Sequence, residues 1–118
     1  FSTSELIPSA GQGIIALQCR ERDDKIIDIL KNINHMPTYY CAIAERNVLK
    51  ILEGDCETAV GVFAEIFDKE IRLEAELFSI DGSKRFTEKK SKPIKFVEDL
   101  GKEVGIILKE KSNNSYKR

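Results

Sequence analysis

The stretch AVGVFAEIFDKEIRLEAELFSIDGS, residues 59–83, alternates between apolar and other side chains with a period of two. Such alternation is typical of β-strands with one buried face, because successive side chains point to opposite sides of a sheet. The pattern breaks at Asp68-Lys69 and at Asp81-Gly82, and both dipeptides suit tight hairpin turns. The stretch therefore predicts two antiparallel strands, 60–67 and 71–77.

Helical spacing of apolar residues precedes these strands. A helix is predicted over about 37–53, and Gly54 suits the position just past its end. Glu45 and Arg46 fall off its apolar stripe, and mid-helix charges of this kind are usually solvated or ion-paired. The stripe consists of Cys41, Ala44, Val48 and Leu52.

A short, charged edge strand over 84–88 and a last helix after Pro93 follow the hairpin. One apolar sheet face needs one cover, which two helices can supply. Residues 36–111 are thus predicted to form an α+β domain, a three-stranded antiparallel sheet covered on one face by helices. The polar tail, 112–118, is expected to be disordered.

The N-terminal third is less obviously part of that unit. Residues 1–13 have loop composition, and the short apolar run 14–17 predicts a buried strand. A helix is predicted to follow, capped by Asp23 or Asp24. Its apolar positions are Ile26, Ile29, Leu30 and Ile33.

Composition excludes several function classes. The 118 residues carry 19 basic and 20 acidic side chains, so we expect no general attraction to nucleic acid or to an anionic membrane. No apolar run approaches the roughly 20 residues of a membrane span. Three cysteines without a CxxC pair favour a reducing, cytosolic setting over a disulfide framework, and a single His argues against a structural zinc site. The chain opens with Phe, in mid-pattern, and we expect it to be a fragment of a longer protein or a processed chain.

Two short stretches could carry chemistry. Gly11-Gln12-Gly13 lets backbone N–H groups approach a ligand, but by itself a plain turn is the better interpretation. Cys56 follows a helix C-terminus and stands between Asp55 and Glu57, three features that disfavour a thiolate. Its reactivity would require positive charge supplied from elsewhere in the protein.

Three segments in this order resemble the C-terminal part of the porphobilinogen deaminase family, also called hydroxymethylbilane synthases. They are PSAGQGIIALQCR (8–20), AERNVLKILEGDC (44–56) and the strand-forming stretch 59–83. The family carries P-A-x-G-Q-G-A, then E-R followed by L-E-G-G-C-x-x-P-[IV]-G, then strands with a D-G turn. Order and spacing match along nearly the whole chain, and the combination is far more specific than any one motif.

The resemblance implies a reaction and a covalent cofactor. The family's enzymes condense four porphobilinogen molecules into hydroxymethylbilane, release ammonia, and carry a dipyrromethane cofactor on the Cys of the L-E-G-G-C loop. Cys56 occupies that position, with Gly54 and Asp55 beside it. Gln12 and Gly13 would contact cofactor or pyrrole. The catalytic Asp and the arginines that bind the pyrrole acids would lie in two preceding domains, so this chain alone is expected to be inactive and to lack cofactor.

The resemblance also divides the chain. Residues 1–13 would be a hinge that lines the cleft between the first two domains of the enzyme. Residues 14–35 would form a strand and a helix that complete the first domain, and residues 36–111 would form the third domain, which anchors the cofactor. The expected partners are porphobilinogen and the two N-terminal domains of the same, monomeric and cytoplasmic, protein. Without the first domain, residues 14–33 should be partly disordered or pack differently.

Several positions depart from the family pattern. Asp55 replaces the second Gly of L-E-G-G-C, and Ala59 replaces the Pro three residues after the Cys of that motif. Gln18 replaces the Glu of the E-x-R with which the family's first motif ends. Asp55 matters most, because a carboxylate beside an acidic cofactor adds repulsion. The alternative hypothesis is a stand-alone α+β binding or interaction module in which Cys56 is a structural cysteine.

Overall fold

A computed structural model describes residues 2–53 and 57–117. Three of the predicted site residues, Gly54, Asp55 and Cys56, therefore lie outside the described residues. In chain order the elements are α1 (Asp24–Ile33), α2 (Met36–Leu52), β1 (Val60–Phe67), β2 (Glu70–Phe78), β3 (Arg85–Pro93), a 3-10 turn (Ile94–Phe96) and α3 (Val97–Ser112).

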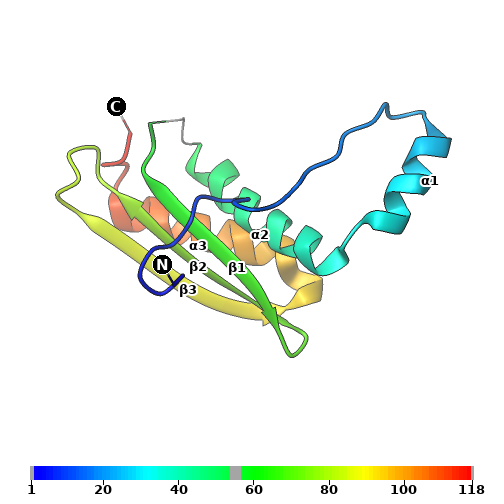
Figure 1. The fold of residues 1–118 in the computed structure, drawn as a ribbon. Helices are drawn as coiled ribbons and strands as arrows, with labels where there is room; N and C mark the ends of the chain where they lie inside the picture. Colours follow the sequence, from blue (N-terminus) through cyan, green and yellow to red (C-terminus); the bar gives the residue numbers. More distant parts are fainter. Residues whose placement is uncertain (1, 54–56, 118) are drawn as a thin grey trace.

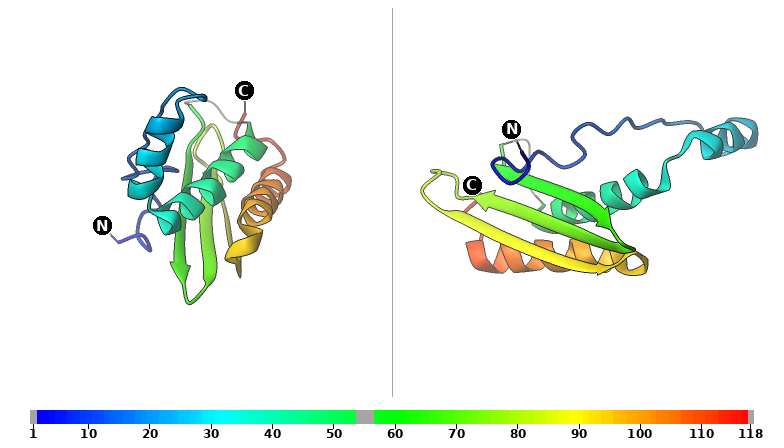
Figure 2. Two further views of the ribbon diagram at one scale, coloured as in Figure 1. Left: turned by 90° about the vertical axis from the view of Figure 1, so that its right-hand side faces the viewer. Right: turned by 60° about the horizontal axis from the view of Figure 1, so that its bottom comes forward.

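The domain has two layers, a sheet and a pair of helices. The strands are antiparallel in the order β1-β2-β3, and α2 and α3 cover one face of the sheet (Figures 1 and 2). This confirms the predicted α+β class. The core consists of the inward-facing strand residues and the apolar stripes of both helices, including Val48, Leu52, Val62, Leu73, Leu77, Leu100, Val104 and Leu108.

Both predicted turns are present, for the expected reason. Asp68 and Lys69 have φ of 48° and 69°, the left-handed conformation that a two-residue hairpin with the right twist requires. Gly82 has φ of 70°. Beside it, the Asp81 carboxylate accepts hydrogen bonds from Ser79 Oγ and Ser83, which lower its pKa to about 2. The turns therefore set the register of the three strands.

The third strand is longer than predicted, running from Arg85 to Pro93 rather than over 84–88. Tertiary pairing explains the extension. Lys89 bonds Glu74 across the strands at 2.7 Å, and Lys90 and Lys92 both pair with Glu103 on α3. Residues 89–93, which the sequence did not assign to the strand, thus belong to it, and three of their lysines find acidic partners.

The strand predicted at 14–17 is wrong for this structure. These residues run without a ladder partner, and Ile15 and Leu17 are 88% and 61% exposed. A strand forms only where a neighbouring edge bonds it, and the free edge of β1 is bonded instead by the Pro8 carbonyl and the Glu45 carboxylate. The helix that follows is confirmed, and Asp23 caps it by accepting from the Ile26 N–H.

Helix α1 stands away from the two layers at the end of this extended segment (Figure 1). None of its residues is buried. The radius of gyration is 15.5 Å, against about 13.5 Å for a compact domain of this length. No helix within the described ranges is long and apolar enough to cross a membrane.

The prediction of a disordered tail is also wrong. After α3, Asn113 and Asn114 adopt positive φ and turn the chain back. Tyr116 is then 3% exposed, and its hydroxyl donates to the Leu52 carbonyl at 2.8 Å. One aromatic ring with a satisfied hydroxyl is enough to anchor a polar segment that composition alone describes as disordered.

Two glycines allow α2 and α3 to approach closely. A Cβ built on Gly101 would lie 2.3 Å from the Ala44 carbonyl oxygen, and one on Gly105 would lie 2.7 Å from Ile51 Cβ. Both distances are shorter than van der Waals contact. Because Gly101 and Gly105 are four residues apart, they lie on one face of α3 and form the seat for α2.

The first prediction concerns this seat. In an exposed helix interior, replacing Gly by Ala stabilises by about 1 kcal/mol. At position 101 the added methyl group overlaps the α2 backbone, and overpacking usually costs about 1–3 kcal/mol. We therefore expect Gly101→Ala to lower the free energy of unfolding, measured by urea denaturation. The exposed neighbour variant Lys102→Ala should change it by no more than about 0.5 kcal/mol, and a gain in stability for Gly101→Ala would contradict the close packing.

Candidate functional site

The two predicted site residues that the structure describes, Gln12 and Gly13, lie on one tight loop. In this glycine loop, residues 9–14, the Gln12 N–H donates to Ser9 O and the Ile14 N–H to Gly11 O, both at 3.1 Å. Gly11 and Gly13 have φ of 76° and 78°. A Cβ on either would meet nothing within 4 Å, so backbone conformation, not crowding, requires glycine there.

The segment before the loop runs along the free edge of the sheet. The Val62 N–H of β1 donates to the Pro8 carbonyl at 2.8 Å. Beside it, a Cβ on Gly61 would lie 2.6 Å from the Ile7 carbonyl oxygen. Gly61, the last Gly of the motif described above, is therefore required by the close approach of Ile7, which is itself buried.

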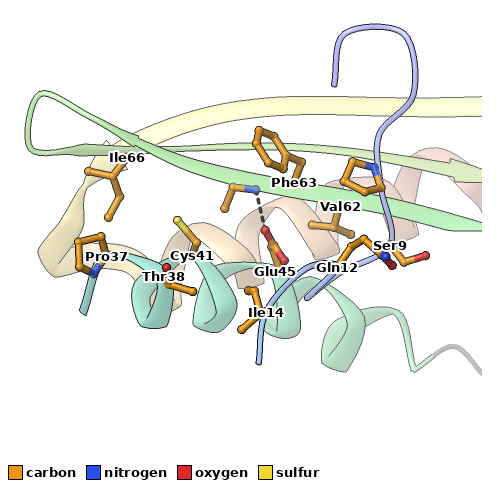
Figure 3. Close-up of a pocket in the computed structure, with 12 residues that line it drawn as sticks. Ser9, Gln12, Ile14, Pro37, Thr38, Cys41, Glu45, Val62, Phe63 and Ile66 are labelled. Carbon is orange, nitrogen blue, oxygen red and sulfur yellow. Dashed lines mark hydrogen bonds between the residues drawn. The ribbon is translucent and has the colours of Figure 1, made fainter. Parts of the chain in front are cut away.

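Glu45 fastens the glycine loop to the domain. Its carboxylate accepts from the Gly11 N–H at 2.7 Å and, through the other oxygen, from the Ala64 N–H at 2.8 Å. Figure 3 shows Glu45 pointing from α2 toward β1, where the dashed line marks the second of these bonds. One side chain thus connects α2, the edge strand and the glycine loop.

Sequence reasoning placed Glu45 on the polar side of its helix, and this was wrong. The residue is only 5% exposed. The available signal was its spacing, since Glu45 is four residues after Cys41 and seven before Leu52, and so shares their face. Burial raises the pKa of Glu45, while the bonds from Gly11 and Ala64 act in the opposite direction.

A cavity of about 280 Å³ lies between the glycine loop, the first half of α2 and β1 (Figure 3). Gln12 from the loop and Glu45 from α2 line it, together with the sulfur of Cys41. Burial first, and then the charges of Glu45 and Glu65, raise the pKa of Cys41. A half-buried thiol in an acidic setting is a poor nucleophile, which agrees with its interpretation as a core residue.

A second, larger groove of about 540 Å³ lies between the extended segment 14–19, α1 and the start of α2. Its wall is mostly apolar and includes Ile15, Leu17, Cys19, Ile33 and Tyr39. Several of these side chains are among the most exposed apolar groups described. Within the described residues, no three His, Cys, Asp or Glu side chains gather to hold a metal ion.

Fold and site together define a class, a two-layer α+β domain that holds a glycine loop against the free edge of its sheet. Residues 39–110 match the family described as "Porphobilinogen deaminase, C-terminal domain". The chain belongs to the porphobilinogen deaminase family.

Individual relatives agree with that membership. The chain is 35% identical over 102 residues to porphobilinogen deaminase of Desulforamulus reducens, a match covering 86% of this chain and 33% of that protein. It is 44% identical over 82 residues to the porphobilinogen deaminase of Sphingopyxis alaskensis, a match covering 69% of this chain and 26% of that protein. The chain therefore spans about a third of the length of the curated relatives that it matches.

The raised pKa of Glu45 leads to a pH prediction. The folded protein holds the proton of the Glu45 carboxyl group more tightly than the unfolded chain does. The stability that this proton contributes is therefore fully present below the ordinary pKa of 4.5 and is lost as pH rises through the folded-state pKa. Glu45→Gln removes this dependence. The free energy of unfolding of the unsubstituted chain, relative to the variant, should fall as pH rises above about 4.5 in denaturant titrations.

The matched control is Glu65→Gln on β1, where the side chain is exposed. It measures how far the loss of one exposed carboxylate from the same strand edge changes the free energy of unfolding in the same titrations. A flat difference for Glu45→Gln would contradict the assignment of a buried, proton-retaining carboxylate.

Proposed function

We propose that this chain acts as the C-terminal part of a porphobilinogen deaminase, which condenses four porphobilinogen molecules into hydroxymethylbilane, and that Cys56 is the covalent anchor of its dipyrromethane cofactor. The observation that carries the proposal is the family match over residues 39–110, joined to the position of Cys56 in the family's L-E-G-G-C motif. Neither Cys19 nor Cys41 stands in such a motif.

The chemistry suits a thiol. Porphobilinogen carries an aminomethyl group on its pyrrole ring, and loss of the amine leaves an electrophilic methylene carbon. The Cys56 sulfur forms a C–S bond to that carbon as the C–N bond breaks, and the thiol proton leaves with the amine as ammonia. No oxidant or reductant is needed. A thioether also resists the thiols of a reducing compartment, so it provides a permanent anchor for the growing chain.

The described residues fit an acidic pyrrole only in part. The Gln12 amide can donate to a carboxylate, and the space beside Gly13 is open to a ligand. Glu45 in the neighbouring cavity supplies no positive charge, and both of its oxygens are engaged by backbone N–H groups. We infer that Gln12 and Gly13 help to position the pyrrole, while most of the charge that binds its acids comes from the preceding domains.

The extended segment and α1 support a further domain as partner. The chain exposes 8375 Å², against about 6,500 Å² for a folded monomer of this mass. Ile15, Leu17 and Ile33 are among the large apolar side chains that face water. We infer that the first domain of the longer enzyme covers this surface. A stand-alone module would leave it exposed, which counts against the alternative hypothesis.

Asp55 is the departure with the clearest consequence. It places a carboxylate next to the anchoring residue, where the family has glycine. Repulsion from an acidic cofactor should slow loading without preventing it. Asp55→Gly in the full-length enzyme would then load faster than the natural sequence.

The anchor is tested by mass spectrometry of the full-length enzyme. We expect a dipyrromethane adduct on the peptide that contains Cys56, and Cys56→Ser should abolish the adduct and the activity. Cys41→Ser and Cys19→Ser are the matched controls, and both should load normally. An adduct found on either of those two cysteines would overturn the assignment.

The 118-residue chain alone should not consume porphobilinogen, because the acid–base Asp and the anion-binding arginines implied by the family lie in the preceding domains. A colorimetric porphobilinogen assay with the purified chain should show no turnover above buffer. Turnover that disappears in Cys56→Ser would mean that this part of the enzyme is catalytically sufficient.

A further inference from the structure

The hydrogen bonds within the glycine loop do not by themselves fix its position against the domain. They run from Gln12 to Ser9 and from Ile14 to Gly11, so both partners of each bond belong to the loop. The segment that follows, residues 15–18, is exposed and belongs to no strand. The position of the loop therefore depends on contacts with the domain outside it.

The glycines make such contacts necessary. Gly11 and Gly13 stand on either side of Gln12, and glycine loses more conformational freedom on folding than any other residue. A loop of this composition keeps one conformation only if its contacts offset that loss. Ala10 packs against the hydrophobic core, and the Gly11 N–H donates to Glu45 at 2.7 Å. The bond to Glu45 is thus made by the residue directly before Gln12.

Glu45 is suited to hold the loop, because the domain fixes its own side chain. It belongs to α2, is 5% exposed, and accepts from the Ala64 N–H of β1 through its second oxygen at 2.8 Å. A carboxyl group has two oxygens that can each accept a hydrogen bond, whereas a side-chain amide has one. Asp has two as well but is one methylene shorter. The residue type at position 45 therefore matches the task of joining two backbone N–H groups.

Glu45 and Gln12 line the same cavity, between the loop, α2 and β1 (Figure 3). Backbone N–H groups engage both oxygens of Glu45, so its carboxyl group needs no ligand as partner. The Gln12 side chain is exposed, and its amide can donate to a ligand. Any influence of Glu45 on a ligand therefore acts through the placement of the loop.

We propose that Glu45 is a positioning residue of the pyrrole site: by bonding the Gly11 N–H it fixes the glycine loop, and it thereby places Gln12 and Gly13 against the pyrrole. The inference rests on the proposed function, in that Gln12 and Gly13 are taken to contact the pyrrole. The competing explanation is that Glu45 only satisfies the edge of β1 through Ala64. That role is structural and has no effect on the loop.

The first test is amide hydrogen exchange of the 118-residue chain, followed residue by residue by NMR. Glu45→Gln keeps the volume of the side chain and one acceptor oxygen, and Glu45→Ala keeps no acceptor. In Glu45→Ala the Gln12 and Ile14 amides should exchange about five- to tenfold faster, as expected for loss of one hydrogen bond that holds the loop. The increase should be smaller in Glu45→Gln. Faster exchange at Ala64, with Gln12 and Ile14 unchanged, would overturn the proposal.

Two control variants separate the loop from general stability. Glu65→Gln changes an exposed carboxylate on β1, next to Ala64, and should leave the exchange of the loop amides unchanged. Val104→Ala removes buried methyl groups from α3. It should lower the free energy of unfolding without faster exchange at Gln12 and Ile14, because loops open locally and not only when the whole domain unfolds.

The second test is a double-mutant cycle in the full-length enzyme, with porphobilinogen as substrate. Glu45→Gln should raise KM about five- to tenfold and change kcat less, since it weakens a binding loop by about one hydrogen bond. In the Gln12→Ala background the same substitution should raise KM by less than about twofold, because residues that act through one another are not additive. Val104→Ala should have the same effect in both backgrounds. An equal effect of Glu45→Gln in both backgrounds would overturn the proposal.

The outcomes distinguish this proposal from the one on which it rests. An adduct on a residue other than Cys56 would overturn the proposed anchor, while faster loop exchange and a non-additive cycle would still support Glu45 as a positioning residue. If Gln12→Ala leaves KM unchanged, Gln12 does not contact the pyrrole. Both the role of Gln12 and the positioning role of Glu45 are then overturned, and the anchor stands.

Discussion

The close approach of α2 and α3 at Gly101 and Gly105 is the contact on which the rest of this domain depends. The apolar face of the sheet must be covered, and α2 and α3 cover it side by side. Any side chain at these two positions would meet the α2 backbone or Ile51 and push the helices apart. The two glycines therefore set where α2 lies, and α2 in turn sets the positions of the features that concern function.

Three such features meet on α2. Near its middle, Glu45 reaches the edge of the sheet and the glycine loop. At its beginning, the helix forms one wall of the apolar groove with α1. At its end, Lys109 and Tyr116 bond the last carbonyls before the proposed anchor. A single helix thus contacts the glycine loop, forms one wall of the groove proposed to face the first domain, and ends three residues before the proposed anchor in the sequence.

Local pattern predicted most of the elements, because their signals are contained in short stretches. The period of two predicted β1 and β2, and the Asp68-Lys69 and Asp81-Gly82 dipeptides predicted the two turns. Asp23 was expected to cap α1, and it does. The strand predicted at 14–17 is not present, because a strand exists only where another strand bonds it and no described strand bonds these residues.

Family membership, element types and the cysteine proposed as anchor could all be read from the order of residues, because motifs and periodicity are local properties. The burial of Glu45, the length of β3 and the packing of Tyr116 were decided only by tertiary structure. Each depends on a partner 19 to 64 residues away or on a neighbouring strand, as in the bonds of Glu45 to Ala64 and of Tyr116 to Leu52. A local pattern contains no information about partners so far away in the sequence. Charged or polar side chains are therefore predicted to be solvated, although in the fold they are buried with a hydrogen-bond partner.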